Sequence, residues 1–320
     1  YMAIRRPHKP ASEFAATDLF AVNSRGAVSP PPSFYSGFVV DTQLRASDLN
    51  SSSDGTVLFD RLRGDTKALQ TYSTQAESTA GSTVTEQDQM EGIGSNTGVD
   101  TNDLSWMWRR APGYFDVVCY KGTGSNTYFN HNLGVVPEMI WFKARDYAEH
   151  WNVFTTGQGT ASRLRLNEGD EARTNDQNQF WSTLPSATQF RVNSSNEIND
   201  SSYNYIAYLF ASVAGISKLG TYAGTGSAQN IDCGFSAGAR LVLIKRVDVA
   251  GYWMVWDSVR GIVAGNDPYL FLNTTAAQNS SYDYIDPLSS GFTITSSAPA
   301  DNSDTSMNKS GGTYFFYAIA

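Results

Sequence analysis

The stretch LVLIKRVD at residues 241–248 decides the fold, because MIWFKARD occupies residues 139–146, 102 positions earlier. Both are short apolar runs that contain basic residues near their ends. The same offset relates two Gly-Thr-Gly-Ser turns, which begin at Gly122 and Gly224. Repetition at a constant offset is typical of chains built from copies of one structural unit. The sequence therefore contains two copies of a unit of about 100 residues.

A third copy is more degenerate. VLFDRLRG at residues 57–64 resembles MVWDSVRG at residues 254–261, and SWMWRR at residues 105–110 stands where the closing aromatic strand of a unit is expected. In this copy QTY at residues 70–72 replaces Leu-Asn-Thr, and the opening strands are hard to find. Three units are therefore predicted, a degenerate first unit at residues 12–111, a second at 112–214 and a third at 215–320.

The sequence starts with YMAIRRP at residues 1–7, which parallels SWMWRRAP at residues 105–112. Each combines an apolar, strand-like run with two arginines and a proline. We expect residues 1–11 to hold the closing strand of an upstream unit, followed by a linker. An extended N-terminal arm of a complete protein is the alternative interpretation.

The composition favours strands and turns over helices. Aromatic residues make up 13% of the chain and charged residues 17%, below the roughly 25% that is typical. Apolar runs are separated by Gly-, Ser- and Asn-rich turn signals at intervals of roughly 8 to 15 residues. We predict an all-β fold of tandem antiparallel β-sandwiches, jelly-roll or lectin-like in style. Because the junctions between units are short, we expect the sandwiches to be stacked in a row.

The charge of the chain excludes some classes of partner. A net charge of −8 and a pI near 4.9 argue against nucleic acid, which is bound through basic surfaces. The same charge argues against docking on an anionic membrane, and no apolar run is long enough for insertion. Cys119 and Cys233 lie in different units, and we expect both to be buried free thiols.

No motif predicts an enzyme, a metal site or a cofactor. His8 lies beside a proline, His131 lies in a turn, and His150 precedes a tryptophan. The chain has no Gly-x-Ser-x-Gly elbow and no His or Cys pair at metal-binding spacing. The Gly-Thr-Gly turns precede strands and not helices, so hairpin turns are preferred to phosphate loops.

Two groups of acidic residues are possible sites. Glu168, Asp170 and Glu171 cluster in a loop of the second unit, and a glycosidase needs only two carboxylates at the right separation. The third unit has no acid there, which favours a solvated loop. A group formed by Asp100, Asn102 and Asp103 resembles a calcium loop only loosely, because it lacks the glycine and the distal glutamate.

Aromatic residues in polar loops are the better candidates for a binding site. Tyr282 and Tyr284 flank Asp283 in a Ser- and Asn-rich loop of the third unit, and Trp181 occupies the matching region of the second. Exposed rings beside Asn and Asp can stack on sugars and bind their hydroxyls. We predict a glycan-binding site at these four residues. The alternative is that the rings cap the sandwich or lie in a subunit interface.

Several motifs resemble a repeat found in tail- and virion-associated proteins of bacteriophages, especially marine phages. The similarity covers essentially the whole chain and is strongest after residue 115. The motifs that carry it are HNLG at residues 131–134, VPEMIWFK at 136–143, YIAYLFA at 205–211, LNTTAA at 272–277 and GGTY at 311–314.

This resemblance implies a structural component of the phage particle, a tail fibre or related fibre that presents β-sandwich modules for host attachment. It implies other tail or capsid proteins as partners, and fibres of this kind are commonly homotrimers. It transfers no catalytic residue. A dedicated glycan-binding module that recognises the host surface and a capsid-decorating protein remain alternatives, and a depolymerase is the least favoured.

Overall fold

The computed structural model describes residues 14–24, 32–79, 85–95, 102–160, 162–174 and 180–320. The strand predicted within residues 1–11 lies outside these residues. The fold is all-β and antiparallel, as predicted. Its short helical pieces are η1 (Ala16–Asp18) and α1 (Asn196–Asn199). No helix in the described ranges has the length and apolar character needed to cross a membrane.

Three large sheets share the same order over five strands, and the first has a sixth strand at its edge. The first has the order β1 (Phe20–Ser24), β9 (Leu104–Trp108), β3 (Thr42–Ala46), β4 (Thr56–Asp60), β5 (Lys67–Gln70) and β6 (Ser78–Thr79). The second has the order β10 (Phe115–Lys121), β16 (Asn204–Phe210), β12 (Met139–Ala144), β13 (Asn152–Thr155) and β14 (Leu164–Arg165). The third has the order β17 (Ser217–Ala223), β24 (Thr313–Ile319), β19 (Leu241–Arg246), β20 (Trp253–Asp257) and β21 (Leu270–Phe271).

A smaller sheet packs on the outer face of each large one, and in the first unit its apolar residues contact β1 and β9. These outer sheets are β2 (Phe34–Tyr35), β8 (Gly92–Ser95) and β7 (Thr85–Glu86) in the first unit, β11 (Thr127–Asn130) and β15 (Gln189–Val192) in the second, and β18 (Gln229–Asp232), β23 (Gly291–Ile294) and β22 (Ile285–Leu288) in the third. The unit boundaries remain predictions; they fall between β9 and β10 and between β16 and β17.

The central strands are apolar on both faces, and each face packs into a different core. Along β16, Tyr208 and Phe210 enter a core shared by all three large sheets, whereas Ala207 and Leu209 enter the core of the second sandwich. Side chains of a strand alternate between faces, so a continuous apolar run requires cover on both sides. The outer sheet covers one face, and the neighbouring units cover the other.

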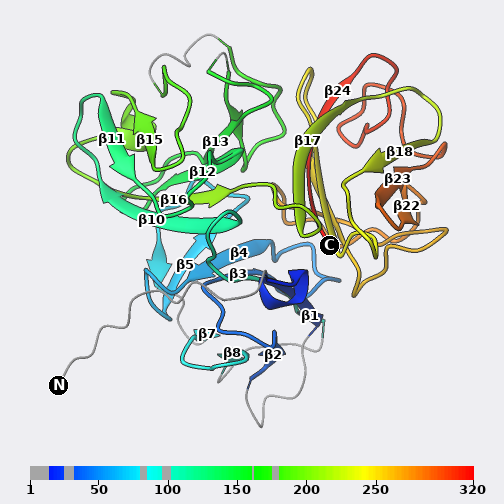
Figure 1. The fold of residues 1–320 in the computed structure, drawn as a ribbon, viewed down its shortest axis with the longest axis horizontal. Coiled ribbons are helices and arrows are strands. Elements are labelled where there is room, and N and C mark those ends of the chain that lie inside the picture. Colours follow the sequence, from blue (N-terminus) through cyan, green and yellow to red (C-terminus); the bar gives the residue numbers. More distant parts are fainter. Residues whose placement is uncertain (1–13, 25–31, 80–84, 96–101, 161, 175–179) are drawn as a thin grey trace.

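The three sandwiches therefore surround one shared core and are not stacked in a row (Figure 1). Aromatic rings connect them across this core. The rings of Trp108 and Phe115 lie 6.4 Å apart between the first two sheets, and those of Phe210 and Tyr317 lie 5.4 Å apart between the second and third. Such pairs add to the free energy gained by burying the rings themselves. A row would leave these inner faces exposed to water.

Polar contacts also join the units. Nζ of Lys143 donates to the carbonyl oxygen of Thr74 in the first unit at 3.3 Å. Nζ of Lys245, one unit later, donates to the carbonyl oxygens of Gly169 at 3.1 Å and Asp170 at 2.8 Å. Both lysines are fully buried. They occur at equivalent positions of the repeat. The same kind of hydrogen bond, from a buried lysine to a backbone carbonyl oxygen, therefore joins the second unit to the first and the third to the second.

Candidate functional site

The predicted aromatic site is only partly exposed. Tyr282 is 48% exposed, but Tyr284 is 5% exposed and Trp181 is 2% exposed. The expectation that all three rings are accessible is therefore wrong for Trp181 and Tyr284. Asp283 lies next to Tyr282 and is half-buried. The structure brings Tyr282, Asp283 and Tyr284 together in one loop and places Trp181 in a different sandwich.

The tyrosines of the third unit form a stack from the surface inwards. The rings of Tyr282 and Tyr284 lie 5.2 Å apart with an interplanar angle of 14°, and the ring of Tyr269 lies 5.4 Å from Tyr284 on the inner side. This loop is fixed to Asp267, whose backbone N–H donates to the carbonyl oxygen of Tyr282 at 2.9 Å. Tyr282 therefore presents a ring that is held in place by the rings beneath it.

Asp267 is a buried carboxylate below this stack. Its Oδ1 accepts a hydrogen bond from the backbone N–H of Val263 at 2.9 Å, and its Oδ2 accepts one from Ile285 at 3.3 Å. Burial, together with the nearby carboxylates of Asp283 and Asp286, outweighs these bonds and raises the pKa of Asp267 to about 7. Three acids thus lie close to Tyr282, which disfavours an anionic ligand there.

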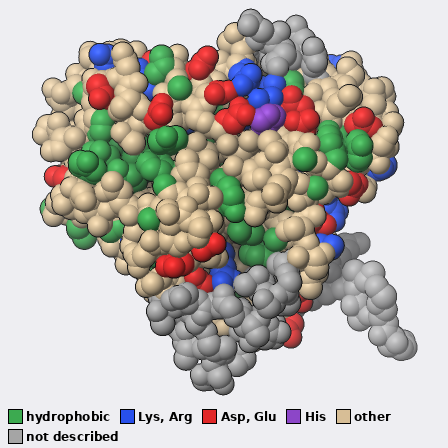
Figure 2. Space-filling model, turned by 180° about the vertical axis from the view of Figure 1, so that it is seen from behind, with side chains coloured by type: hydrophobic (Ala, Val, Ile, Leu, Met, Phe, Trp, Pro, Cys, Tyr) green, Lys and Arg blue, Asp and Glu red, His purple; other side chains and the backbone are tan. Residues whose placement is uncertain are grey.

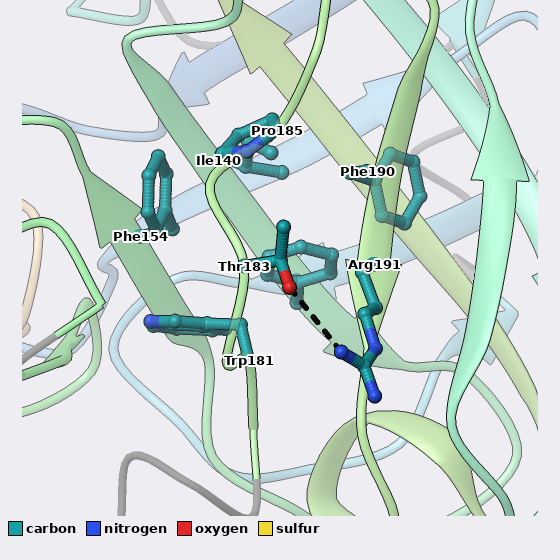
Figure 3. Close-up of a pocket in the computed structure, with 8 residues that line it drawn as sticks. Ile140, Phe154, Trp181, Thr183, Pro185, Phe190 and Arg191 are labelled. Atoms are coloured by element: carbon teal, nitrogen blue, oxygen red, sulfur yellow. Dashed lines mark hydrogen bonds between the residues drawn. The ribbon is translucent and has the colours of Figure 1, made fainter.

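Trp181 belongs to the core of the second sandwich. Its ring stacks on Phe142 at 5.8 Å and meets the edge of Phe154 at 5.6 Å. Figure 3 shows Trp181 and Phe154 with Thr183, whose hydroxyl accepts a hydrogen bond from Arg191 at 3.2 Å. The cavity among them measures about 10 Å³, which has room for a water molecule but not for a sugar ring.

The acidic loop of the second unit belongs to an ion-pair network. The guanidinium of Arg165 lies between two carboxylates, donating from Nη1 to Glu168 at 3.2 Å and from Nη2 to Glu197 at 3.2 Å. Nδ1 of His150 lies 3.1 Å from Glu168, and Arg173 binds both Glu168 and Asp170. Figure 2 shows basic, acidic and histidine side chains gathered on one face of the molecule.

This network is poorly suited to acid–base hydrolysis. A glycosidase needs one carboxyl group that stays protonated near neutral pH. Although burial raises the pKa of Asp170, hydrogen bonds with Glu168 and Arg173 lower it below its ordinary value. Burial and Arg165 also lower the pKa of His150. Opposite charges are therefore already paired here, and the arrangement holds the loop in place.

The remaining candidates have structural partners. Nε2 of His131 lies 3.1 Å from the carbonyl oxygen of Ser186, within the turn that the sequence indicates. Asp103 pairs with Arg45 at 2.6 Å, while Asp100 and His8 lie outside the described residues. The described ranges hold no group of three or more His, Cys, Asp or Glu residues arranged to bind a metal ion.

The two cysteines differ in their surroundings. Both are free thiols, as expected, and Cys233 is buried. Cys119 is exposed, which corrects the expectation that it is buried. It lies on β10, an edge strand of the second sheet. Its side chain lies on the inner face of β10 with those of Phe115 and Val117, but nearer the end of the strand, and the shared core does not cover it. The sequence run VVCY does not reveal which strands lie at an edge.

The chain matches one protein family. The family model described as a domain of unknown function (DUF7483) matches residues 47–320, and the chain belongs to this family. Neither a curated protein nor a solved structure matches the chain. The match begins within the first sheet and includes all of the second and third units.

Proposed function

We propose that this DUF7483 protein is a structural component of a bacteriophage virion, a tail fibre or related fibre that presents β-sandwich modules for host attachment. The observation that carries the proposal is the construction around one shared core, which packs three sandwiches against one another within one chain. Such a body suits a mechanical and presenting role. The phage-like motifs at residues 136–143 and 205–211 overlap its central strands, β12 and β16.

The location can be tested on particles. Phage particles would be purified by density gradient from a culture that produces this protein, and their proteins identified by mass spectrometry. We expect peptides of this chain in intact particles, at a constant ratio to the major capsid protein. Immunogold labelling then separates a tail fibre from a capsid-decorating protein. Detection in infected cells but never in purified particles would contradict the proposal.

We also propose that the protein is a homotrimer. The shared core limits which surfaces such a trimer can use. The three inner faces already cover one another within a chain, so a trimer would have to form through outer surfaces. Light scattering on the purified protein measures the mass directly. A mass near three chains supports the homotrimer, and a mass of 35.0 kDa contradicts it for this chain.

Glycan binding at the third unit is the second candidate function. It is favoured by the exposed ring of Tyr282, which is held by the stack beneath it. Tyr282→Ala should weaken binding of the protein to host envelope polysaccharide. Tyr128→Ala is the matched control, because Tyr128 is 53% exposed in another sandwich. An equal loss in both variants, or none in either, would contradict a site at Tyr282.

A further inference from the structure

The first sheet contains a cavity that the aromatic loops do not explain. It measures about 170 Å³ and lies on the outer face of strands β3, β4 and β5. Its lining residues are Arg45, Ser47, Val57, Phe59, Ala68, Gln70 and Ser78. We name it the first-sheet pocket. Arg45, Phe59 and Ala68 are buried, whereas Ser78 is exposed, so the pocket runs from the surface down to the sheet.

A small side chain in the first unit contributes to this pocket. Leu69, Leu164 and Leu270 occupy equivalent places in the fourth pairing of each sheet, between β4 and β5, β13 and β14, and β20 and β21. The residues just before them are Ala68, Arg163 and Tyr269. Arg163 and Tyr269 are large and buried, and they fill the outer side of their sandwiches. Ala68 leaves this space empty in the first unit.

A second exchange makes the pocket polar. Pairing of the central strands places Arg45 where the second unit has Phe142 and the third has Ile244. In the second sandwich this region is packed with aromatic rings and retains a cavity of about 10 Å³ (Figure 3). The first unit therefore has open, partly polar space where its sister unit has a filled apolar core.

The charge around the pocket is balanced. Arg45 is 2.6 Å from Asp103, and both side chains are almost completely buried. Because the cation already has an anion beside it, the pair attracts neither sign strongly at a distance. The whole chain carries a charge of −8, which further disfavours an anionic ligand. An uncharged ligand suits this environment best.

The lining has the mixed character of a site for a hydroxylated ring. Phe59, Val57 and Ala68 offer apolar contact, while Gln70 and two serines offer amide and hydroxyl groups nearer the mouth. A cavity of roughly 150 Å³ holds a six-membered ring such as benzene, so this pocket has room for a pyranose ring whose outer hydroxyls lie at the open mouth. We propose that the first-sheet pocket binds one neutral hexopyranose unit, alone or at the end of a glycan chain.

Binding can be measured on the purified chain with named probes. The probes are the methyl glycosides of glucose, galactose, mannose and N-acetylglucosamine. Saturation-transfer NMR detects whether each one binds. We expect a signal from at least one of them. Ala68→Tyr, which introduces the residue of the third unit, should fill the pocket and abolish that signal. Gln70→Leu keeps the size of the side chain but removes its amide, and should weaken binding about tenfold.

Controls separate this pocket from other surfaces. Gln75→Leu makes the same chemical change at an exposed position outside the pocket and should leave binding unchanged. Tyr282→Ala should also leave it unchanged, since that ring lies in the third unit. Binding by the isolated chain does not depend on the virion role, so the two proposals can fail separately.

Three outcomes would overturn the pocket proposal. One is the absence of a signal from every neutral glycoside. Another is binding of methyl glucuronide alone, which would show that the site selects an anion. The third is a signal that persists in folded Ala68→Tyr. If that variant does not fold, Gln70→Leu decides, and binding equal to that of Gln75→Leu would then exclude the pocket.

Discussion

At the scale of single residues, two buried lysines, Lys143 and Lys245, join neighbouring units. Nζ of Lys245 donates to three carbonyl oxygens, two in the second unit and that of Gly251 in its own. Burial outweighs the attraction of nearby acids and lowers the pKa of Lys245 to about 7, and burial lowers that of Lys143 to about 8. Burial favours the neutral amine, whereas carbonyl acceptors favour the ammonium form, and the lowered pKa values show that burial outweighs them.

The lowered pKa values of these lysines predict that the free energy of unfolding rises with pH. Between about pH 7 and 10.5 the unfolded chain binds a proton at Lys245 that the folded chain does not, so the free energy of unfolding increases with pH. Lys245→Met should flatten this rise, as measured by urea unfolding at several pH values. Lys218→Met, at an exposed lysine, is the control. An unchanged slope in Lys245→Met would refute the assignment.

The raised pKa of Asp267 predicts that the free energy of unfolding falls as pH rises in a lower pH range. Its raised pKa means that the unfolded chain loses this proton first, so stability falls as pH rises from about 4 to about 7, by at most about 4 kcal/mol. Asp267→Asn should remove that fall, whatever its effect on absolute stability. Thermal unfolding across this pH range provides the measurement, with exposed Asp54→Asn as the control. A fall of the same size in Asp267→Asn would contradict the prediction.

At the scale of elements, hydrogen bonds tie the central strand of one unit to the next sheet. The hydroxyl of Tyr208 on β16 donates to Oδ2 of Asp60 at the end of β4, at 2.6 Å. Nε1 of Trp106 on β9 donates to Asp257 at the end of β20, at 3.3 Å. Trp106 and Tyr208 occupy equivalent registers, so the same contact is made between two different pairs of units.

Removing one such contact should be measurable. Tyr208→Phe deletes only the hydroxyl and leaves a buried carboxylate with one donor fewer, which costs about 1–3 kcal/mol. The free energy of unfolding in urea would show this loss. Tyr128→Phe removes a hydroxyl from a half-exposed ring and should cost less than about 0.5 kcal/mol. Equal values for the two variants would argue against a role of this bond in joining the sheets.

At the scale of the whole molecule, the shared core predicts cooperative unfolding. Leu44, Trp141 and Leu243 come from different units and lie in the same apolar cluster. Loss of one sandwich would expose the inner faces of the other two. Calorimetry should therefore show a single transition whose calorimetric and van't Hoff enthalpies agree. Separate transitions for the three units would show that the core contributes little to their stability.

Much of the local structure can be predicted from the sequence, because it depends on patterns within short segments. The repeated runs at residues 139–144 and 241–246 are strands β12 and β19, and the aromatic run near residue 315 is the central strand β24. An apolar run without helical period, bounded by turn residues, is sufficient to indicate a buried strand. The antiparallel, all-β fold follows from the number and spacing of such runs.

The candidate sites were harder to predict, because exposure depends on what covers a side chain. Trp181 and Tyr282 both occur in polar loops, yet one is buried in a sandwich and the other lies at the surface. The first-sheet pocket has a signal in the sequence, namely Ala68 in place of Arg163 and Tyr269. That signal is readable only after strand register has aligned the three units.

The sequence by itself determined the strands, their antiparallel class and the two stronger copies of the unit, since these reside in local alternation and in a constant offset. Only the tertiary structure decided that the sandwiches enclose one core. Each central strand has two apolar faces. The sequence pattern of such a strand indicates that both faces are buried, but it does not indicate which segments cover them. The partners are segments about 100 residues away, and only their packing in space identifies them.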